Sequence, residues 1–222
     1  FSFFATSEAI VQAGLVPVFV DVNEKDCNIN VKKIEEKITN NTGAILPVHL
    51  FGNAAEMDAL MELAKSRNLK IVEDVAQSFG TKYKDKQLGT IGDLGCFSFF
   101  PTKTLGAYGD GGAIATDSDE LAELCVMYRN HGAKKKYFNE VFGYNSRLDS
   151  IQASILSLKL KKIDDWINQR IKAGQYYDKK FSKIENIDLL NNLNSTYNYY
   201  SIFVKNGQRD SLQAFLSDKE IA

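Results

Sequence analysis

The fold class is decided by two stretches of the chain, KIVEDVAQSFG at residues 70–80 and GDLGCFSFFPTKTLGAYGDGGAIAT at residues 92–116. They contain short apolar runs at 70–74, 95–100 and 112–116, which are typical of buried strands. The first run ends in two acids, and a lysine follows shortly after the second. In open α/β sheets, ligands bind beyond the carboxyl ends of the strands, so these polar groups are candidates for a binding site.

Outward from this centre, strand and helix patterns alternate along the chain. Residues 16–22 and 43–50 are rich in β-branched and apolar residues and are predicted as strands. Residues 31–38, 54–67 and 118–128 have apolar positions at helical spacing, and Ser118 before two acids is a helix start. This alternation predicts an open, mixed and mostly parallel α/β sheet with helices on both faces.

The pattern changes after residue 148. Apolar residues at helical spacing predict one long helix over 149–177, followed by an edge strand at 198–205 and a helix at 210–222. We therefore expect 1–148 to form the core of a large domain, 149–177 to connect it, and 178–222 to begin a smaller domain. The chain starts in an apolar run without methionine and stops inside a helix pattern, so we expect a piece incomplete at both ends.

Composition excludes several classes of function. Among 222 residues, 27 are Lys or Arg and 28 are Asp or Glu, a balance that argues against a nucleic-acid or polybasic membrane surface. No apolar run approaches the roughly 20 residues that a membrane-spanning helix needs. The three cysteines form no CxxC pair and only two histidines occur, so no metal site is expected. The odd cysteine count and the absence of a secretion leader favour a cytoplasmic protein.

Asp74 and Lys103 are the first candidates for chemistry. A carboxylate at the end of a buried strand needs a cationic partner or strong donors, although a helix cap or a solvated loop acid would have the same pattern. A lysine after an aromatic strand becomes nucleophilic if burial lowers its pKa, although most such lysines simply lie on the surface. The glycines of residues 106–112 precede a predicted strand and do not open a helix. They therefore do not form the dinucleotide-binding glycine motif, which disfavours a Rossmann-type nucleotide-sugar reductase.

Taken together, these motifs resemble one family. EDVAQSFG at 73–80, the 92–116 stretch and GYNSRLDSIQASIL at 143–156 are similar to the DegT/DnrJ/EryC1/StrS family, as are residues 1–22 and PVHLFGNAAEMD at 47–58. The resemblance runs to about residue 166. It implies a pyridoxal-phosphate (PLP) enzyme of fold type I, with an aspartate aminotransferase-like large domain.

The resemblance also implies roles for the residues around the cofactor. Lys103 matches the lysine that binds PLP covalently, and Asp74 matches the acid facing the pyridine nitrogen. Gln77 matches the residue near the ring hydroxyl, and Ser98 matches a hydroxyl that contacts the phosphate. Phe3 matches the aromatic residue that stacks on the ring.

Two further positions also match family residues. Asn145 matches an asparagine that reaches the phosphate in the neighbouring subunit's site, which implies a homodimer with shared active sites. His49 matches a family histidine without a defined role, and a satisfied structural histidine is the favoured interpretation. The Gly-Thr or Gly-Ser segment that holds the phosphate in the family would precede Phe1.

The implied activity is transfer of an amino group from an amino acid, with glutamate as the expected donor, to a nucleotide-linked keto-sugar. Such a step serves amino-sugar biosynthesis for cell-surface polysaccharide or secondary metabolites. Two alternatives within the fold stay open. A PLP- or pyridoxamine-phosphate-dependent sugar dehydratase lacks the covalent lysine, so Lys103 favours transamination. A non-catalytic regulator is disfavoured because Asp74, Gln77, Ser98 and Lys103 occur together.

Overall fold

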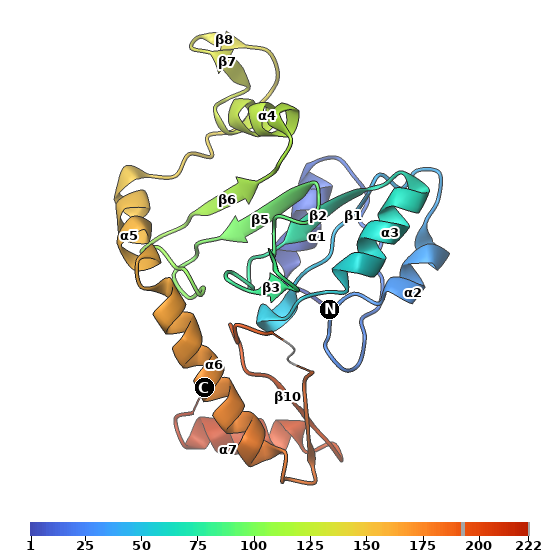
Figure 1. The fold of residues 1–222 in the computed structure, drawn as a ribbon, viewed down its shortest axis with the longest axis vertical. Coiled ribbons are helices and arrows are strands. Elements are labelled where there is room, and N and C mark those ends of the chain that lie inside the picture. The colour runs from blue at the N-terminus through green and yellow to red at the C-terminus, as the bar shows by residue number, and fades with distance from the viewer. Residues whose placement is uncertain (192–193, 222) are drawn as a thin grey trace.

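A four-stranded sheet forms the centre of the molecule in the computed structural model, which describes residues 1–191 and 194–221 (Figure 1). The spatial order is β1-β2-β5-β6, in which β1, β2 and β5 run parallel and β6 is antiparallel to β5. The mixed, mostly parallel sheet is therefore confirmed. The strand bounds are Ala44–Ile45 for β1, Lys70–Asp74 for β2, Leu94–Ser98 for β5 and Gly112–Ala115 for β6.

Helices cover both faces of this sheet, as the alternating side chains of β2 show. Ile71 is buried against α3 (Met57–Arg67), in a cluster that includes Met57 and Leu60 of that helix. Asp74, three residues further along the strand, points to the opposite face, where Thr6 of α1 (Phe4–Gln12) donates a hydrogen bond to it. Successive side chains of a strand point to opposite faces, so α1 and α3 lie on the two sides of the sheet.

The remaining elements surround this core (Figure 1). A short hairpin, β7 and β8, projects beyond α4 at one end of the molecule, and α6, β10 and α7 lie at the other. The bounds of the other helices are Val31–Ile34 (α2), Glu35–Lys37 (η1), Leu50–Gly52 (η2), Asp119–Arg129 (α4), Ser150–Leu160 (α5), Ile163–Phe181 (α6) and Arg209–Asp218 (α7). Those of the other strands are Lys82–Tyr83 (β3), Lys86–Gln87 (β4), Ala133–Lys135 (β7), Phe138–Asn139 (β8), Ile187–Leu189 (β9) and Ile202–Val204 (β10).

The helix start predicted at Ser118 is confirmed. The Ser118 hydroxyl accepts a hydrogen bond from the backbone N–H of Leu121 at 3.3 Å, and two acids occupy the first turn of α4. Both features satisfy or complement the exposed N–H groups at a helix N-terminus. In the described part of the chain, helices long and apolar enough to cross a membrane are absent.

The prediction of a strand over residues 16–22 is wrong. Only Val22 makes a β-bridge there, with Ile29. Val16 and Phe19 are 84% and 73% exposed, so no neighbouring element covers their apolar side chains. Pro17 also lacks the N–H that a ladder needs. Residues 43–50, 198–205 and 210–222 adopt the predicted type of element over shorter spans, and Ala222 lies outside the described residues.

The single helix predicted over 149–177 is also wrong, because the chain breaks into α5 and α6 at residues 161–162. Lys162 leaves the helical region at φ −119° and ψ 3°. Two acids in the first turn of α6 then favour a new helix start. The bend lets Leu156 of α5 and Ile163 of α6 pack into one cluster with Phe99.

Candidate functional site

Asp74 lies at the carboxyl end of β2, where two neighbouring elements hold its carboxylate. The Thr6 hydroxyl of α1 donates to Oδ2 at 2.8 Å, and the backbone N–H of Ala76 donates to Oδ1 at 3.0 Å. In register with Asp74 on β5 is Cys96, whose thiol pKa is raised to about 11, chiefly by burial. The carboxylate is therefore fixed in direction and borders a dry part of the sheet.

Lys103 follows β5 in a turn, in which its backbone N–H donates to the carbonyl of Phe100 at 2.9 Å. Burial lowers the pKa of its amine, and the negative charge of Asp74 partly opposes that shift. The Asp74 carboxylate is therefore near enough to affect the Lys103 amine; that the two side chains share one site stays a prediction. An amine with a lowered pKa is more often unprotonated at a given pH, which makes it a better nucleophile toward carbonyl groups.

Gln77 is oriented by the strained backbone of Phe51. The backbone N–H of Phe51 donates to Gln77 Oε1 at 2.8 Å, and Phe51 has the left-handed conformation, φ 62°, which is uncommon for a residue other than glycine. The amide oxygen thus accepts from the chain itself, and the NH₂ group of Gln77 adds two hydrogen-bond donors. A ligand oxygen beside Gln77 would thus meet a hydrogen-bond donor.

Ser98 and Phe3 lie close in sequence to Lys103 and Thr6, respectively. Ser98 is the last residue of β5, and its hydroxyl accepts a hydrogen bond from the Phe100 N–H at 3.3 Å. Phe3 precedes α1, and its carbonyl accepts from the Thr6 N–H at 3.3 Å, one turn from the contact with Asp74. Phe3 is 72% exposed, so its ring is available to cover a ligand.

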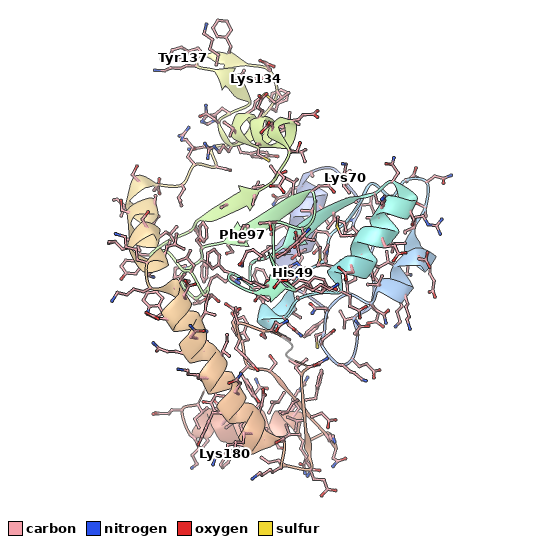
Figure 2. The ribbon with its side chains drawn as sticks, in the orientation of Figure 1. His49, Lys70, Phe97, Lys134, Tyr137 and Lys180 are labelled. Carbon is pink, nitrogen blue, oxygen red and sulfur yellow. The ribbon has the colours of Figure 1, made fainter. Side chains whose placement is uncertain are left out.

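Asn145 belongs to a different part of the molecule. It is exposed and forms a β-bridge with Asn130, at the base of the β7–β8 hairpin. The hairpin projects away from the sheet in Figure 2, where Lys134 and Tyr137 are labelled. The structure therefore groups Asn145 with this hairpin.

His49 is a satisfied structural histidine, as favoured from the sequence. Its side chain is completely buried, with Nδ1 accepting from the Ala55 N–H at 3.1 Å and Nε2 lying 3.0 Å from Glu73 Oε2. Figure 2 places it in the interior of the molecule. Among the described residues, no group of three or more His, Cys, Asp or Glu side chains is placed to hold a metal ion.

Two hollows lie away from Asp74 and Lys103. One is on α3 and β2 beside Met61 and Asp93, and the other lies between residues 22–27 and β9. Neither is lined by the residues predicted to bind a ligand. The predicted residues Asp74, Gln77 and Lys103 are instead half-buried, at or beyond the carboxyl ends of β2 and β5.

Sequence reasoning missed Thr6, Phe51 and Glu73. Thr6 is one hydroxyl in an apolar stretch, and 68 residues separate it from Asp74, so no local pattern links them. Phe51 precedes a glycine, which hints at a turn but not at its contact with Gln77. Glu73 was a member of the acid pair at the end of a predicted strand, and strand alternation would have placed it on the face opposite Asp74.

Comparisons with known proteins identify relatives of the chain. The model of the DegT/DnrJ/EryC1/StrS aminotransferase family matches residues 1–222. The chain is 45% identical, over all its length and 60% of the relative, to the pleiotropic regulatory protein of Geobacillus stearothermophilus. It is 44% identical, over 80% of the chain and 48% of the relative, to UDP-N-acetyl-3-dehydro-alpha-D-glucosamine 3-aminotransferase of Acidithiobacillus ferrooxidans.

A solved structure has the same fold. S. venezuelae DesV, in complex with a ketimine intermediate, superposes with a TM-score of 0.94 at 36% identity, over 100% of this chain and 60% of DesV. The chain thus spans about 60% of the length of relatives that it matches end to end.

Proposed function

The chain belongs to the DegT/DnrJ/EryC1/StrS aminotransferase family, and on this premise we propose that the whole protein is a PLP-dependent aminotransferase. It would transfer an amino group from an amino acid, with glutamate as the expected donor, to the keto group of a nucleotide-linked sugar. The names of relatives support this substrate class, since one is a UDP-N-acetyl-3-dehydro-glucosamine aminotransferase and another a dTDP-3-amino-trideoxyglucose transaminase. The product would be an amino sugar for polysaccharide or secondary-metabolite biosynthesis.

The observation that carries the proposal is the pairing of Lys103 with Asp74. A pyridine ring with an aldehyde needs an amine at one side and an acid at the other. Lys103 offers an amine whose pKa burial has lowered, and Asp74 offers a carboxylate already oriented by Thr6. Gln77 adds a donor for a ring oxygen. The donor set therefore fits PLP.

Each residue of this set would have a defined task. When bound, PLP supplies the electron sink that stabilises a carbanion at the substrate carbon. Lys103 would hold it covalently and, once displaced, move a proton as a general base and acid. Asp74 would accept a hydrogen bond from the pyridine N–H and keep that nitrogen protonated. Phe3 would cover the ring and exclude water, and Ser98 would contact the phosphate.

The proposal also includes a homodimer and a cytoplasmic location. Asn145 lies away from β2 and β5 within the chain, which supports its expected role in the neighbouring subunit's site and hence a homodimer. The cytoplasmic location expected from the cysteines stays a prediction.

Covalent trapping tests the proposal in the complete protein. We expect a yellow protein with PLP and, after borohydride reduction, a cofactor adduct on Lys103 in the peptide map. Lys103→Ala should abolish transamination and the adduct while leaving the fold unchanged by circular dichroism. Lys65→Ala, at an exposed lysine of α3, is the matched control and should retain both. An adduct on another lysine, or wild-type turnover of Lys103→Ala, would refute the assignment.

A regulatory function is the second candidate, because one relative 45% identical to the chain is named a pleiotropic regulatory protein. The same trapping experiment separates the two functions. A regulator without catalysis should show no turnover of any amino donor even when Lys103 carries the cofactor. The sugar dehydratase stays the less supported alternative, because its members replace the lysine that this chain retains at position 103.

A further inference from the structure

Glu73 is a buried carboxylate one residue before Asp74, on the opposite face of β2. Its side chain and that of His49 are both completely buried. Four hydrogen-bond donors surround its two oxygens. Oε2 lies 3.0 Å from His49 Nε2 and 2.8 Å from the backbone nitrogen of Gly89. Oε1 lies 2.8 Å from the backbone nitrogen of Ile91 and 2.7 Å from that of Gly92.

All four partners donate, so the site requires an acceptor at both oxygens. His49 Nδ1 accepts from the Ala55 N–H at 3.1 Å, which places the ring proton on Nε2, facing Glu73. Burial alone would raise the pKa of Glu73, but the hydrogen bonds from His49 and from the backbone N–H groups of Gly92 and Gly89 outweigh it and hold the pKa below its ordinary value. Glu73 is therefore a buried anion that an amide of the same shape cannot replace without opposing two donors.

This carboxylate joins the two segments that border Asp74. On one side, the backbone N–H of His49 donates to the Asp74 carbonyl at 3.0 Å, and the backbone N–H of Asp74 donates to the Pro47 carbonyl at 2.9 Å. The ring of the same histidine contacts Glu73. On the other side, the loop of residues 89–92 leads into β5, the strand that ends before Lys103. A Cβ at Gly95 of β5 would lie 2.1 Å from the Gly89 carbonyl oxygen, so this loop packs directly on that strand.

We propose that Glu73, together with His49, is a positioning residue that fixes Asp74 relative to the strand and turn that carry Lys103. The inference rests on the proposed function, because Asp74 and Lys103 are the two groups that would hold PLP from opposite sides. It goes beyond that function because Glu73 is buried on the strand face opposite Asp74, where His49 and the backbone of residues 89–92 occupy both of its oxygens. Loosening the Glu73 contacts should let Asp74 shift away from the pyridine nitrogen and change the electronics of the bound ring.

The test uses the complete protein, PLP and the variant Glu73→Gln. The readout is the pH midpoint of the visible absorbance of the cofactor bound to Lys103. A weaker contact from Asp74 leaves less positive charge on the ring, so the conjugated nitrogen keeps its proton to higher pH and the midpoint rises. Asp74→Asn defines the largest such rise, and Glu73→Gln should give part of it. Glu62→Gln, at an exposed glutamate of α3, is the matched control and should leave the midpoint unchanged.

Kinetics add a second readout. A small displacement of a catalytic group can lower turnover by about 10- to 100-fold, so kcat of Glu73→Gln should fall by that order while KM for the amino donor stays close to wild type. A residue that only stabilises the fold would lower the melting temperature and leave the midpoint and kcat of the folded protein unchanged. That result for Glu73→Gln would overturn the proposal.

Two substitutions of His49 decide the question if Glu73→Gln does not fold. In His49→Gln the amide nitrogen can take the place of Nε2 and donate to Glu73, whereas in His49→Asn the amide oxygen can accept from Ala55 but the side chain is too short to reach Glu73. The midpoint of His49→Gln should lie closer to wild type than that of His49→Asn. Equal midpoints would refute the role of Glu73. Failure of borohydride to label Lys103 in the wild-type protein would instead refute the proposed function itself.

Discussion

Asp74 and Lys103 show how single side chains acquire chemistry from their surroundings. Burial withdraws water from the Lys103 amine and lowers its pKa, while the carboxylate of Asp74 raises it again. The balance leaves the pKa of this amine below the ordinary value for a lysine. This combination can be examined without cofactor, because both effects act on the chain's own groups.

Asp74→Asn should lower the pKa of Lys103 in the cofactor-free protein. The substitution removes the only contribution that raises this pKa, so the desolvation that lowers it acts alone. Competitive labelling with acetic anhydride across a pH series, read by peptide mass spectrometry, should show the Lys103 midpoint at lower pH in the variant. Lys65 in the same samples is the internal reference. The control Asp85→Asn, which removes an exposed acid of the β3–β4 turn, should leave the Lys103 midpoint unchanged. Equal Lys103 midpoints in Asp74→Asn and wild type would contradict the pairing of Asp74 with Lys103.

The helices and strands that match the prediction are those whose own residues explain why they form. The helix at Ser118 has a cap and acids that satisfy its own N-terminus, and β2 spans the predicted residues 70–74. Residues 16–22 have strand composition, but pairing depends on a neighbour that local composition does not specify. The break at Lys162 depends on packing of α5 and α6 against Phe99, a contact more than fifty residues away in sequence.

The candidate site shows the same difference between local pattern and contacts with distant segments. Asp74 and Lys103 could be predicted because polar groups after strands are brought to one edge of a sheet. The contacts of Thr6, Phe51 and Glu73 could not, because they join segments distant in sequence. For Glu73, strand alternation predicts the face of the sheet but not the partners.

The contact between α6 and residues 194–200 allows a prediction at the scale of elements. Gly174 of α6 is buried, and a Cβ there would lie 2.6 Å from the ring of Tyr197. The ring is held in place, since the Tyr197 hydroxyl donates to Asp178 Oδ2 at 3.0 Å. Gly174→Ala should gain about 1 kcal/mol of helix propensity but lose about 1–3 kcal/mol through overpacking, so the free energy of unfolding should fall.

Urea denaturation of both proteins measures this difference. Gly43→Ala is the matched control, because no heavy atom lies within 4 Å of the added Cβ and the substitution should be neutral or slightly stabilising. A Gly174→Ala protein at least as stable as wild type would show that Tyr197 moves aside, and that α6 does not depend on this close approach.

At the scale of the whole molecule, several large apolar side chains have no cover within the described chain. Tyr137 and Phe142, in the hairpin region, are 84% and 102% exposed, and Ile151 and Leu158 of α5 are 73% and 66% exposed. A second subunit packed on the hairpin region and on α5 would cover these side chains. Asn145 lies between the hairpin and α5 in sequence, so an interface formed by these elements would carry it into contact with the partner.

Subunit mixing tests whether Asn145 acts across that interface. If it does, each site takes Lys103 from one subunit and Asn145 from the other. The complete protein should then be inactive with Lys103→Ala and impaired with Asn145→Ala. Unfolding and refolding them together in equal amounts should generate heterodimers in which one of the two sites has both native residues. Random pairing in a two-fold symmetric dimer predicts recovery of about a quarter of the wild-type sites, measured as transamination rate. Mixing Lys103→Ala with wild-type protein gives the control for refolding yield. If the mixture of variants shows only the mean of the two separate activities, Asn145 acts within its own subunit, and the shared site is excluded.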